Sequence, residues 1–412
     1  MNRTILHSDM NCFYASVEMM LNPELQGKAV AVCGSTENRH GIVLAKSEKA
    51  KQAGIKTGMV NWEAKRLCPD LILVPPQYEQ YLKYSNMARE IYQEYTDLVE
   101  PYGMDECFLD VTASQVLYGS GKEIADQIRC RMKNELGLTV SIGISFNKIF
   151  AKLGSDMKKP DAITSIEESE WKQKVWPLRV SELLFCGRST TKKLEQVGIY
   201  TIGDLAEMDH DYVNQLLGKN GLMLWSYANG LDDSPVMEKD FVSPMKSVGH
   251  GITCTADLKT EEEVWKVILE LCQDIGHRLR IHGLKAQGVQ IAIRSQELFT
   301  RQYQGQLSLP TIGPLEIAKL ARELFQRNYD WKEPVRSVTV RAINLVSAKE
   351  PEQICLFSDP IRLEKEEKLF LAIEEIRRRF GKRAIYPAAL MKDLKMPEYR
   401  DHGLIMPGVM NR

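Results

Sequence analysis

The chain has 412 residues, of which 44% are hydrophobic and 26% are charged, and its net charge is −1. This length predicts about two to four domains. The composition is typical of a soluble globular protein, and the near-neutral charge does not by itself indicate a nucleic-acid partner. No apolar run approaches the roughly 20 residues that span a bilayer, and the N-terminus does not read as a signal peptide. The nine cysteines form no C-x-x-C pair, which favours reduced thiols in the cytoplasm and argues against a zinc site.

Strands and helices are mixed over the first 166 residues. The apolar patterns predict strands at residues 3–10, 28–33, 41–45, 107–111 and 139–145. They predict helices at residues 13–20, 46–53, 62–67, 78–98, 122–136 and 147–157. The longest of these helices, 78–98, rests on apolar side chains at helical spacing.

The second half of the chain changes character twice. Residues 167–230 are helical in pattern, and residues 231–245 are polar, carry two prolines and have no period, which predicts a linker. Residues 246–346 then read as strand, helix, strand, strand, helix, strand, which predicts a compact α+β module. Beyond residue 347 we expect a tail with a charged helix near 362–380, most simply a solvated one. The alternative for residues 361–382 is a basic helix that lies against DNA or a partner.

Carboxylates interrupt two of the apolar strand patterns. Asp9 lies at the end of the first strand, and Asp105 and Glu106 precede the strand at 107–111. Buried carboxylates are costly unless a positive group neutralises them. If the two strands are neighbours, the acids meet, and oxygen ligands with Mg²⁺ point to phosphoryl or nucleotidyl transfer. The alternatives are a helix N-cap at Asp9 and a polar turn at 102–106.

Residues 141–160 read as a strand, a turn and a helix that ends in lysines. Lysines in this place suit a triphosphate, whose charge a divalent cation neutralises only in part. The alternative is a solvated helix face, which is the usual meaning of a charge run.

Three blocks of sequence together resemble one family. They are residues 9–18 (DMNCFYASVE), 104–110 (MDECFLD) and 141–160 (SIGISFNKIFAKLGSDMKKP). Their order and spacing are similar to those of the bacterial Y-family, or DinB/UmuC-type, translesion DNA polymerases, and the similarity extends from residue 3 to about residue 380. Three long blocks in register are far more specific than one motif.

The resemblance implies an α+β multidomain fold, arranged as a right-hand polymerase with a helix-hairpin-helix thumb and an α+β little finger. The implied domains are a palm (1–10 and 78–166), fingers (11–77), a thumb (167–230), a linker (231–245), a little finger (246–346) and a tail (347–412). The implied activity is low-fidelity, template-directed addition of dNTPs to a primer 3′-hydroxyl.

The resemblance also implies roles for residues of this chain. Asp9, Asp105 and Glu106 would be side-chain ligands of two Mg²⁺ ions, with the Met10 carbonyl as a further ligand. Tyr14 matches the steric gate that excludes a 2′-hydroxyl, and Phe13 would support it. Without the resemblance, both rings read as ordinary core aromatics. Lys159 matches the family lysine that contacts the triphosphate.

The sequence departs from the family pattern near the expected triphosphate. Asn11 stands where many members have Asp, and we do not expect it to be a primary ligand. Glu48 and Lys51 stand in place of a Tyr and an Arg. Lys51 can keep the charge contact but not the bidentate fork of Arg, and Glu48 is expected to pair with it on one helix face. Gly103 replaces a common Ser.

Duplex contacts are expected in the thumb. A Gly-containing turn leads into a basic helix, which resembles the family's helix-hairpin-helix and would present backbone N–H groups to phosphate. The residues expected to contact DNA are Gly187, Arg188, Lys192 and Lys193. The alternative is a helical hairpin that only packs. The module 246–346 carries 14 Lys and Arg against 11 Asp and Glu, a mild excess that suits a duplex backbone or an ordinary mixed surface.

A pentapeptide in the tail resembles the bacterial sliding-clamp motif. It comprises Gln353, Ile354, Cys355, Leu356 and Phe357, in which Gln353, Ile354, Leu356 and Phe357 would make the contact. Two apolar side chains can anchor such a peptide in a pocket. The alternative is one more strand of the domain.

The expected partners are therefore primer–template DNA, a dNTP and the sliding clamp, with no membrane, and the protein is expected to be a cytoplasmic monomer. A catalytically inactive Y-family scaffold that binds DNA and the clamp is the alternative function. Another palm-domain nucleotidyltransferase or cyclase is a third, but the thumb, linker and C-terminal module argue against it.

Overall fold

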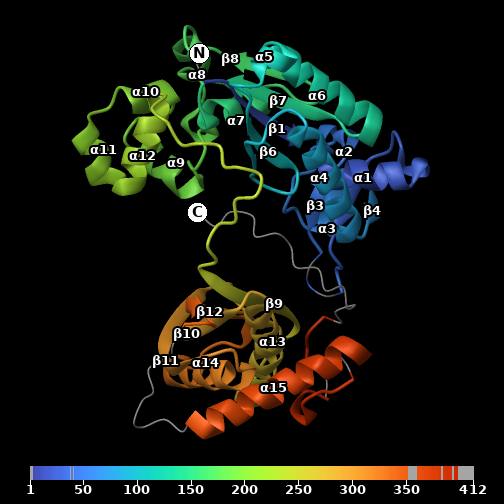
Figure 1. Ribbon diagram of the computed structural model, residues 1–412, viewed down its shortest axis with the longest axis vertical. Helices are drawn as coiled ribbons and strands as arrows, with labels where there is room; N and C mark the ends of the chain where they lie inside the picture. Colours follow the sequence, from blue (N-terminus) through green and yellow to red (C-terminus); the bar gives the residue numbers. More distant parts are fainter. Residues whose placement is uncertain are drawn as a thin grey trace.

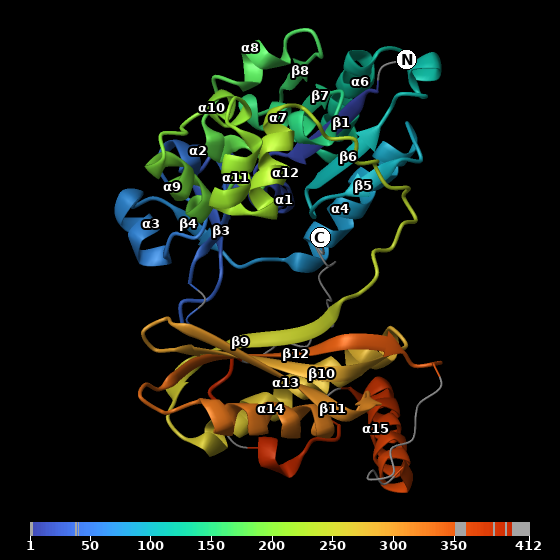
Figure 2. The same cartoon turned by 90° about the vertical axis from the view of Figure 1, so that its left-hand side faces the viewer.

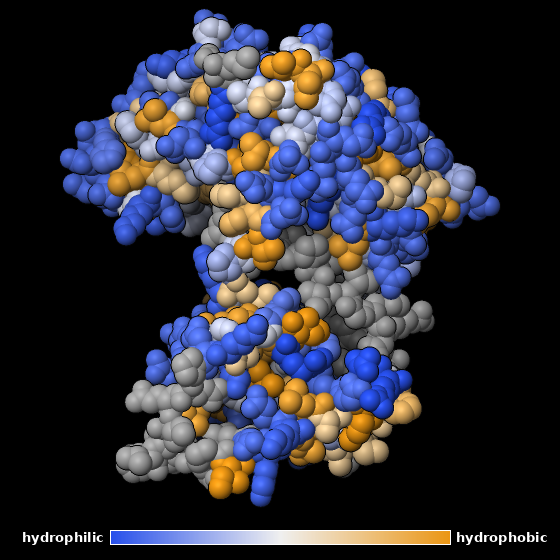
Figure 3. Space-filling model, in the orientation of Figure 1, coloured by the Kyte–Doolittle hydropathy of each residue, from blue (hydrophilic) through white to orange (hydrophobic). Residues whose placement is uncertain are grey.

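The computed structural model describes residues 3–37, 39, 41–350, 360–381, 384–391 and 394–397. It is a mixed α and β protein. Among the described residues, four large hydrophobic cores mark four units along the chain, and a fifth, smaller cluster lies in the first unit. Three units form one body, and the fourth lies beyond a linker (Figure 1) and meets the second unit through an ion pair of Arg39 with Asp257. The face drawn in Figure 3 is mostly hydrophilic and narrows between the two bodies. Among the described helices, none is long and apolar enough to cross a membrane.

The first unit is built on a five-stranded sheet in the order β5-β6-β1-β7-β8. The strands are β1 (Ile5–Met10), β5 (Val99–Pro101), β6 (Glu106–Asp110), β7 (Val140–Ser145) and β8 (Ile163–Ile166). Only the β7–β8 pairing is parallel. β1 lies in the centre, and all six of its residues are buried. The expected pairing of the first strand with the strand after Glu106 is confirmed.

The two faces of this sheet are covered by different helices. Side chains alternate between the faces of a strand, so Leu6 packs in one core with α4 (Tyr78–Gln93) and α6 (Gly121–Leu136). Ile5 instead packs with Ala151 of α7 (Lys148–Met157). Asp9 has the same parity as Ile5, and it therefore faces α7. The short helix α5 (Gln115–Tyr118) precedes α6.

Glycine allows α7 to lie directly on the sheet. A Cβ at Gly143 of β7 would come 1.9 Å from the Ala151 carbonyl oxygen of α7. Any larger residue would push the helix away from the strand. The close approach brings the polar face of α7 to the end of β1.

The second unit has a three-stranded sheet in the order β3-β2-β4. Its elements are α1 (Phe13–Leu21), η1 (Pro23–Leu25), β2 (Val30–Cys33), β3 (Val43–Lys46), α2 (Glu48–Gln52), α3 (Asn61–Leu67) and β4 (Ile72–Val74). The third unit is helical, as expected for residues 167–230. Its elements are α8 (Trp171–Val175), η2 (Val180–Glu182), α9 (Arg188–Gln196), α10 (Ile202–Ala206), α11 (His210–Leu217) and α12 (Lys219–Ala228).

The fourth unit is the expected α+β module. Its sheet has the order β11-β10-β12-β9, and helices lie beneath one face of it (Figure 2). The elements are β9 (Ser247–Leu258), α13 (Glu261–Ile281), β10 (Leu284–Ser295), β11 (Thr300–Thr311), α14 (Pro314–Asn328), β12 (Val335–Ser347), α15 (Pro360–Phe380) and η3 (Ala388–Leu390).

The tail helix α15 differs from the solvated helix that the charge pattern predicts. Its Phe370 is 4% exposed and belongs to the core of the fourth unit, and Glu374 is 6% exposed. Glu374 accepts a hydrogen bond from His277 and lies 3.5 Å from Arg280, both on α13. Arg377 donates to Gln273, also on α13, at 3.2 Å. One face of α15 is therefore docked on α13.

The linker has no regular secondary structure, but its first part is bound to the first unit. The Nζ atom of Lys148 donates to the Pro235 carbonyl at 3.1 Å and to Glu100 at 2.6 Å. Glu100 in turn accepts from the backbone N–H of Met237 at 3.0 Å. Val236 is buried against the sheet. The segment after residue 239 is mostly exposed.

The helix predicted at 78–98 ends earlier, at Gln93. Thr96 explains this, because its hydroxyl donates to the Asp110 carbonyl at 2.8 Å and accepts from the Leu98 N–H at 3.1 Å. Such local bonds compete with helical ones. The chain then forms β5, which the sequence patterns did not predict.

Candidate active site

The strand register brings the three predicted carboxylates together. Asp9 of β1 lies directly opposite Glu106 of β6, and the Met10 N–H donates to the Asp105 carbonyl at 2.9 Å. Asp105 lies in the turn of the β5–β6 hairpin, which the bond from Tyr102 N–H to the Glu106 carbonyl closes at 2.9 Å. Adjacent residues of a strand point to opposite faces, but a residue in the turn is free of that alternation. Asp105 and Glu106 can therefore serve one centre.

Two lysines of the α7 segment lie among these carboxylates. The Nζ atom of Lys152 lies 3.2 Å from Asp9 Oδ2 and 3.1 Å from Glu106 Oε1. The Nζ atom of Lys159 lies 2.8 Å from the same Asp9 oxygen. Both ammonium groups also contact Asp156, at 3.1 and 2.9 Å. The site is thus a compact network of carboxylates and ammonium groups around the nearly buried carboxylate of Asp9.

Burial and charge move the pKa values of the acids in different directions. Burial raises the pKa of Asp9, the charge of Glu106 adds to this, and Lys152 and Lys159 oppose it. Burial, followed by the charges of Asp9 and Glu106, raises the pKa of Asp105 to about 6. For Glu106, burial is outweighed by the neighbouring His7 ring and by Lys152, which lower the pKa to about 2. Crowded carboxylates of this kind favour a bound cation.

The donor chemistry of this centre fits Mg²⁺. Carboxylate and carbonyl oxygens are the hard ligands that Mg²⁺ prefers, and Asp9, Asp105, Glu106 and the Met10 carbonyl would supply them. Across the described part of the chain, no three His, Cys, Asp or Glu side chains already stand as a metal-binding group. The Lys152 ammonium lies between two of the acids, Asp9 and Glu106.

Tyr14 lies on α1 beside the acidic centre. Its ring stacks on Tyr81 with centroids 4.1 Å apart, and its hydroxyl donates to Met104 Sδ at 3.3 Å. The ring of Phe13 lies 5.6 Å away and is buried. Tyr81 donates to the buried Glu18 carboxylate. The Tyr14 ring is therefore held in one orientation by its neighbours.

The expected ion pair at the departures from the family pattern is present. Lys51 Nζ lies 3.6 Å from Glu48 Oε1, and the thiol of Cys12 donates to the same carboxylate at 3.2 Å. Asn11 has a structural part: its side chain donates to Ser141 Oγ at 3.0 Å and accepts from the Asp161 N–H at 2.8 Å.

The predicted DNA contacts of the helical unit lie together on its surface. Gly187 is the N-cap of α9, and Arg188, Lys192 and Lys193 follow on that helix. All four residues are exposed. The predicted clamp peptide, with Gln353, Ile354, Leu356 and Phe357, lies outside the described residues.

Sequence reasoning missed three members of the network. Lys152 and Asp156 precede Lys159 by seven and three residues, so the three could have been recognised as one helix face. His7 gave no signal, because a lone histidine in an apolar strand reads as core. His7 is fully buried. Its Nδ1 atom shares a hydrogen bond of 2.8 Å with Ser155 Oγ, and its Nε2 atom lies 3.4 Å from Glu106 Oε2. Burial lowers the pKa of His7, which favours the neutral ring.

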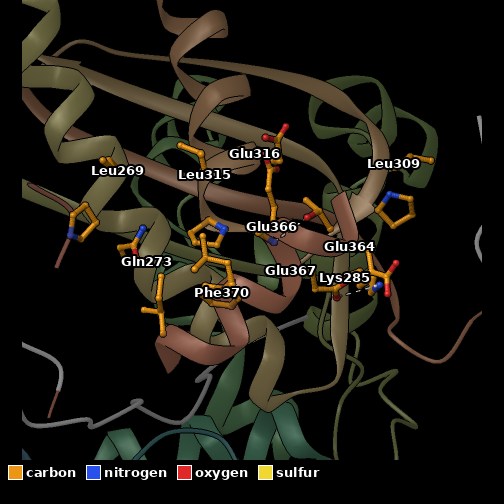
Figure 4. Close-up of a pocket in the computed structure, with 17 residues that line it drawn as sticks. Leu269, Gln273, Lys285, Leu309, Leu315, Glu316, Glu364, Glu366, Glu367 and Phe370 are labelled. Carbon is orange, nitrogen blue, oxygen red and sulfur yellow. Dashed lines mark hydrogen bonds and ion pairs between the residues drawn. The ribbon is translucent and has the colours of Figure 1, made fainter. Parts of the chain in front are cut away.

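A separate cavity of about 460 Å³ lies in the fourth unit, between α13, β11, α14 and α15 (Figure 4). Leu269, Leu315 and Phe370 form part of its apolar wall, and Lys285 pairs with Glu367 at 3.4 Å on its edge. None of the residues predicted for catalysis lines it. The acidic centre, not this cavity, is the candidate active site.

Comparison with known proteins gives a consistent result. The model of the impB/mucB/samB family matches residues 8–156, and that of the family's C-terminal domain matches residues 245–356. DNA polymerase IV of Acetivibrio thermocellus is 49% identical over 393 residues, which cover 95% of this chain and 98% of that protein. DNA polymerase IV 1 of Bacillus subtilis is 38% identical over 95% of this chain and 94% of its own length. A solved Y-family DNA polymerase chimera superposes with a TM-score of 0.74 at 23% identity, covering 84% of this chain and 99% of that one.

Proposed function

Because the chain belongs to the Y family of DNA polymerases, among the bacterial DNA polymerase IV relatives, we propose that it extends a primer by two-metal-ion nucleotidyl transfer, with low fidelity, past damaged template bases. The observation that carries the mechanism is the register of β1 against β6, which sets Asp9 opposite Glu106. With Asp105 in the adjoining turn, three carboxylates and the Met10 carbonyl are available to two Mg²⁺ ions.

The ions supply one part of the chemistry: when bound, they would lower the pKa of the primer 3′-hydroxyl and stabilise the leaving pyrophosphate. The chain supplies the rest. Asp9, Asp105 and Glu106 would hold the ions, and the pairing of β1 with β6 fixes the spacing of Asp9 and Glu106. Lys159, which contacts Asp9, would neutralise triphosphate charge.

The Tyr14 ring would select the sugar. Its stacking on Tyr81 and its contact with Met104 hold a flat wall beside the acids, with Phe13 behind it. A ribose 2′-hydroxyl would collide with such a wall, whereas deoxyribose would fit. To exclude a ribose, the Tyr14 ring must keep its position, and close packing against its neighbours would hold it there.

Lys51 would be a second contact for the triphosphate. Lys51 is paired with Glu48, and this ion pair partly neutralises its charge. An ammonium gives a point charge where the family pattern has a planar guanidinium. We therefore expect this contact to add modestly to dNTP affinity.

The division into palm, fingers, thumb, linker, little finger and tail is proposed with the boundaries given above. Duplex DNA would contact the exposed basic residues of α9, through Gly187, Arg188, Lys192 and Lys193, and the sheet face of β9–β12. Such contacts to phosphates position a duplex without reading its sequence.

The clamp peptide 353–357 would tether the enzyme to a sliding clamp. We propose that the protein acts as a monomer in the cytoplasm.

A primer-extension assay tests the activity directly. With a primed template, dNTPs and Mg²⁺, the wild type should extend the primer, and Asp105→Ala and Glu106→Ala should each lose at least about a hundredfold in rate. Asp70→Asn, at an exposed site, is the matched control. Absence of extension by the wild type would favour the alternative, an inactive scaffold that still binds DNA and the clamp.

A further inference from the structure

We propose that Lys152 is a built-in cation of the active site, which bridges Asp9 and Glu106 before metal binds and withdraws to Asp156 when metal enters. The inference rests on the proposed two-metal function. Its basis is position: the Lys152 ammonium lies 3.2 Å from Asp9, 3.1 Å from Glu106 and 3.1 Å from Asp156.

Burial gives this arrangement an energetic reason. The side chain of Asp9 is 8% exposed and that of Lys152 is 13% exposed. Carboxylates at this depth repel each other unless a positive charge lies between them. Lys152 supplies that charge from within the fold, and the nearby acids raise its pKa although burial opposes this. The ligands therefore stay gathered without a metal.

The same contact has a cost, because a cation that bridges two ligands competes with any metal for them. Asp156 offers the ammonium another place to go. It lies one turn further along α7, it already contacts Lys152, and its side chain is 47% exposed, so it can follow the lysine toward solvent. After withdrawal, Lys152 and Lys159 would share Asp156 and would both lie beside the entering triphosphate.

Substitutions of Lys152 and of Asp156 should change the affinity for Mn²⁺ in opposite directions. Lys152→Met removes the ammonium that contacts both acids and leaves Lys159 on Asp9. Mn²⁺ should therefore bind about tenfold more tightly in the absence of nucleotide. Asp156→Asn removes the alternative partner, so Lys152 should stay on Asp9 and Glu106, and Mn²⁺ should bind several-fold more weakly. Lys158→Met, at an exposed neighbour on the same segment, should leave binding unchanged.

The measurement is Mn²⁺ binding by electron paramagnetic resonance with full-length protein, together with thermal unfolding in EDTA and in Mg²⁺. In EDTA, Lys152→Met should unfold at a lower temperature than the wild type, and Mg²⁺ should restore more of its stability. Lys152→Arg, which keeps the charge, should behave as the wild type in both assays.

The outcomes separate this inference from the proposed function. If wild type and Lys152→Met bind Mn²⁺ equally, or the variant binds more weakly, the role of Lys152 is wrong while the metal site stands. If neither protein binds Mn²⁺, both ideas fail. If only Lys152→Met binds, both are supported. Should Lys152→Met not fold, a metal affinity of Asp156→Asn equal to or above that of the wild type would overturn the proposal.

Discussion

The phenol ring of Tyr14 lies flat on the ring of Tyr81, with centroids 4.1 Å apart and planes inclined by only 9°. Tyr81 is fully buried, and its hydroxyl donates to Glu18, which also accepts from Gln77 at 2.7 Å. The proposed sugar-selecting wall is thus backed by a second ring, which is itself fixed by a buried carboxylate. Tyr14 would therefore contact the sugar, and Tyr81 would support the Tyr14 ring.

Tyr14→Ala should admit ribonucleotides, because it removes the ring that would meet the 2′-hydroxyl. We expect the preference for dNTP over rNTP, measured as a ratio of kcat/KM values, to fall by at least about a hundredfold. Tyr78→Phe, at a ring that packs edge-on against Tyr14, is the control and should keep the preference. An unchanged ratio in Tyr14→Ala would rule out the assigned gate.

Tyr81→Phe tests whether Tyr81 only supports the Tyr14 ring or also contacts the nucleotide. The stacked ring remains, but the hydrogen bond to buried Glu18 is lost. Leaving a buried carboxylate short of one donor costs about 1–3 kcal/mol, so the free energy of unfolding in urea should fall by that amount while sugar selection stays close to that of the wild type. A large loss of selection without a loss of stability would show that Tyr81 contacts the nucleotide.

The docking of α15 should depend on pH through Glu374. Burial tends to raise the pKa of this carboxyl, but the bond from His277 and the charges of Arg280 and Arg377 outweigh it and hold the pKa below its usual range. A carboxyl with a depressed folded pKa adds stability at pH values above its unfolded pKa, and this is lost as the pH falls through the folded pKa. The helix should therefore be held firmly near neutral pH and released in acid.

Glu374→Gln tests this relation. At pH 7 we expect the free energy of unfolding to fall by roughly 2 kcal/mol, because Arg280 of α13 loses its anionic partner. The difference between wild type and variant should shrink as the pH is lowered through the depressed pKa. Glu375→Gln, on the neighbouring and more exposed position, is the matched control. A difference that stays constant with pH would exclude the assigned role of Glu374.

Sequence patterns predict the pairing of two strands but not the contacts that join distant segments. The meeting of Asp9 with Glu106 was predictable, because a carboxylate in an apolar strand demands a partner and two such strands can satisfy it by pairing. The strands β4, β5 and β8 were missed, since three or four residues give no measurable period. Lys148 and Lys152 read as ordinary helix lysines. Their partners Glu100 and Asp9 lie 48 and 143 residues away, and only the fold brings them together.

Deleting residues 353–357 should abolish stimulation by the sliding clamp and leave basal extension unchanged. The reason is that the peptide would anchor the enzyme through two apolar side chains while the active site lies in another unit. Primer extension with and without the clamp measures both quantities. A scrambled pentapeptide of the same composition is the control for chain length, and clamp stimulation that survives deletion would refute the assignment.

Lys148→Met should loosen the linker. Lys148 is 2% exposed, and it joins Glu100 of β5 to the Pro235 carbonyl, while Met237 N–H donates to the same Glu100. Removing one partner of a buried ion pair costs about 3–5 kcal/mol. We therefore expect a loss of stability of this order and faster amide hydrogen exchange at Met237. The exposed Lys83→Met on α4 should change neither. If exchange at Met237 stayed slow in Lys148→Met, the linker would be held by the burial of Val236 alone, and the ion pair would serve only the packing of α7.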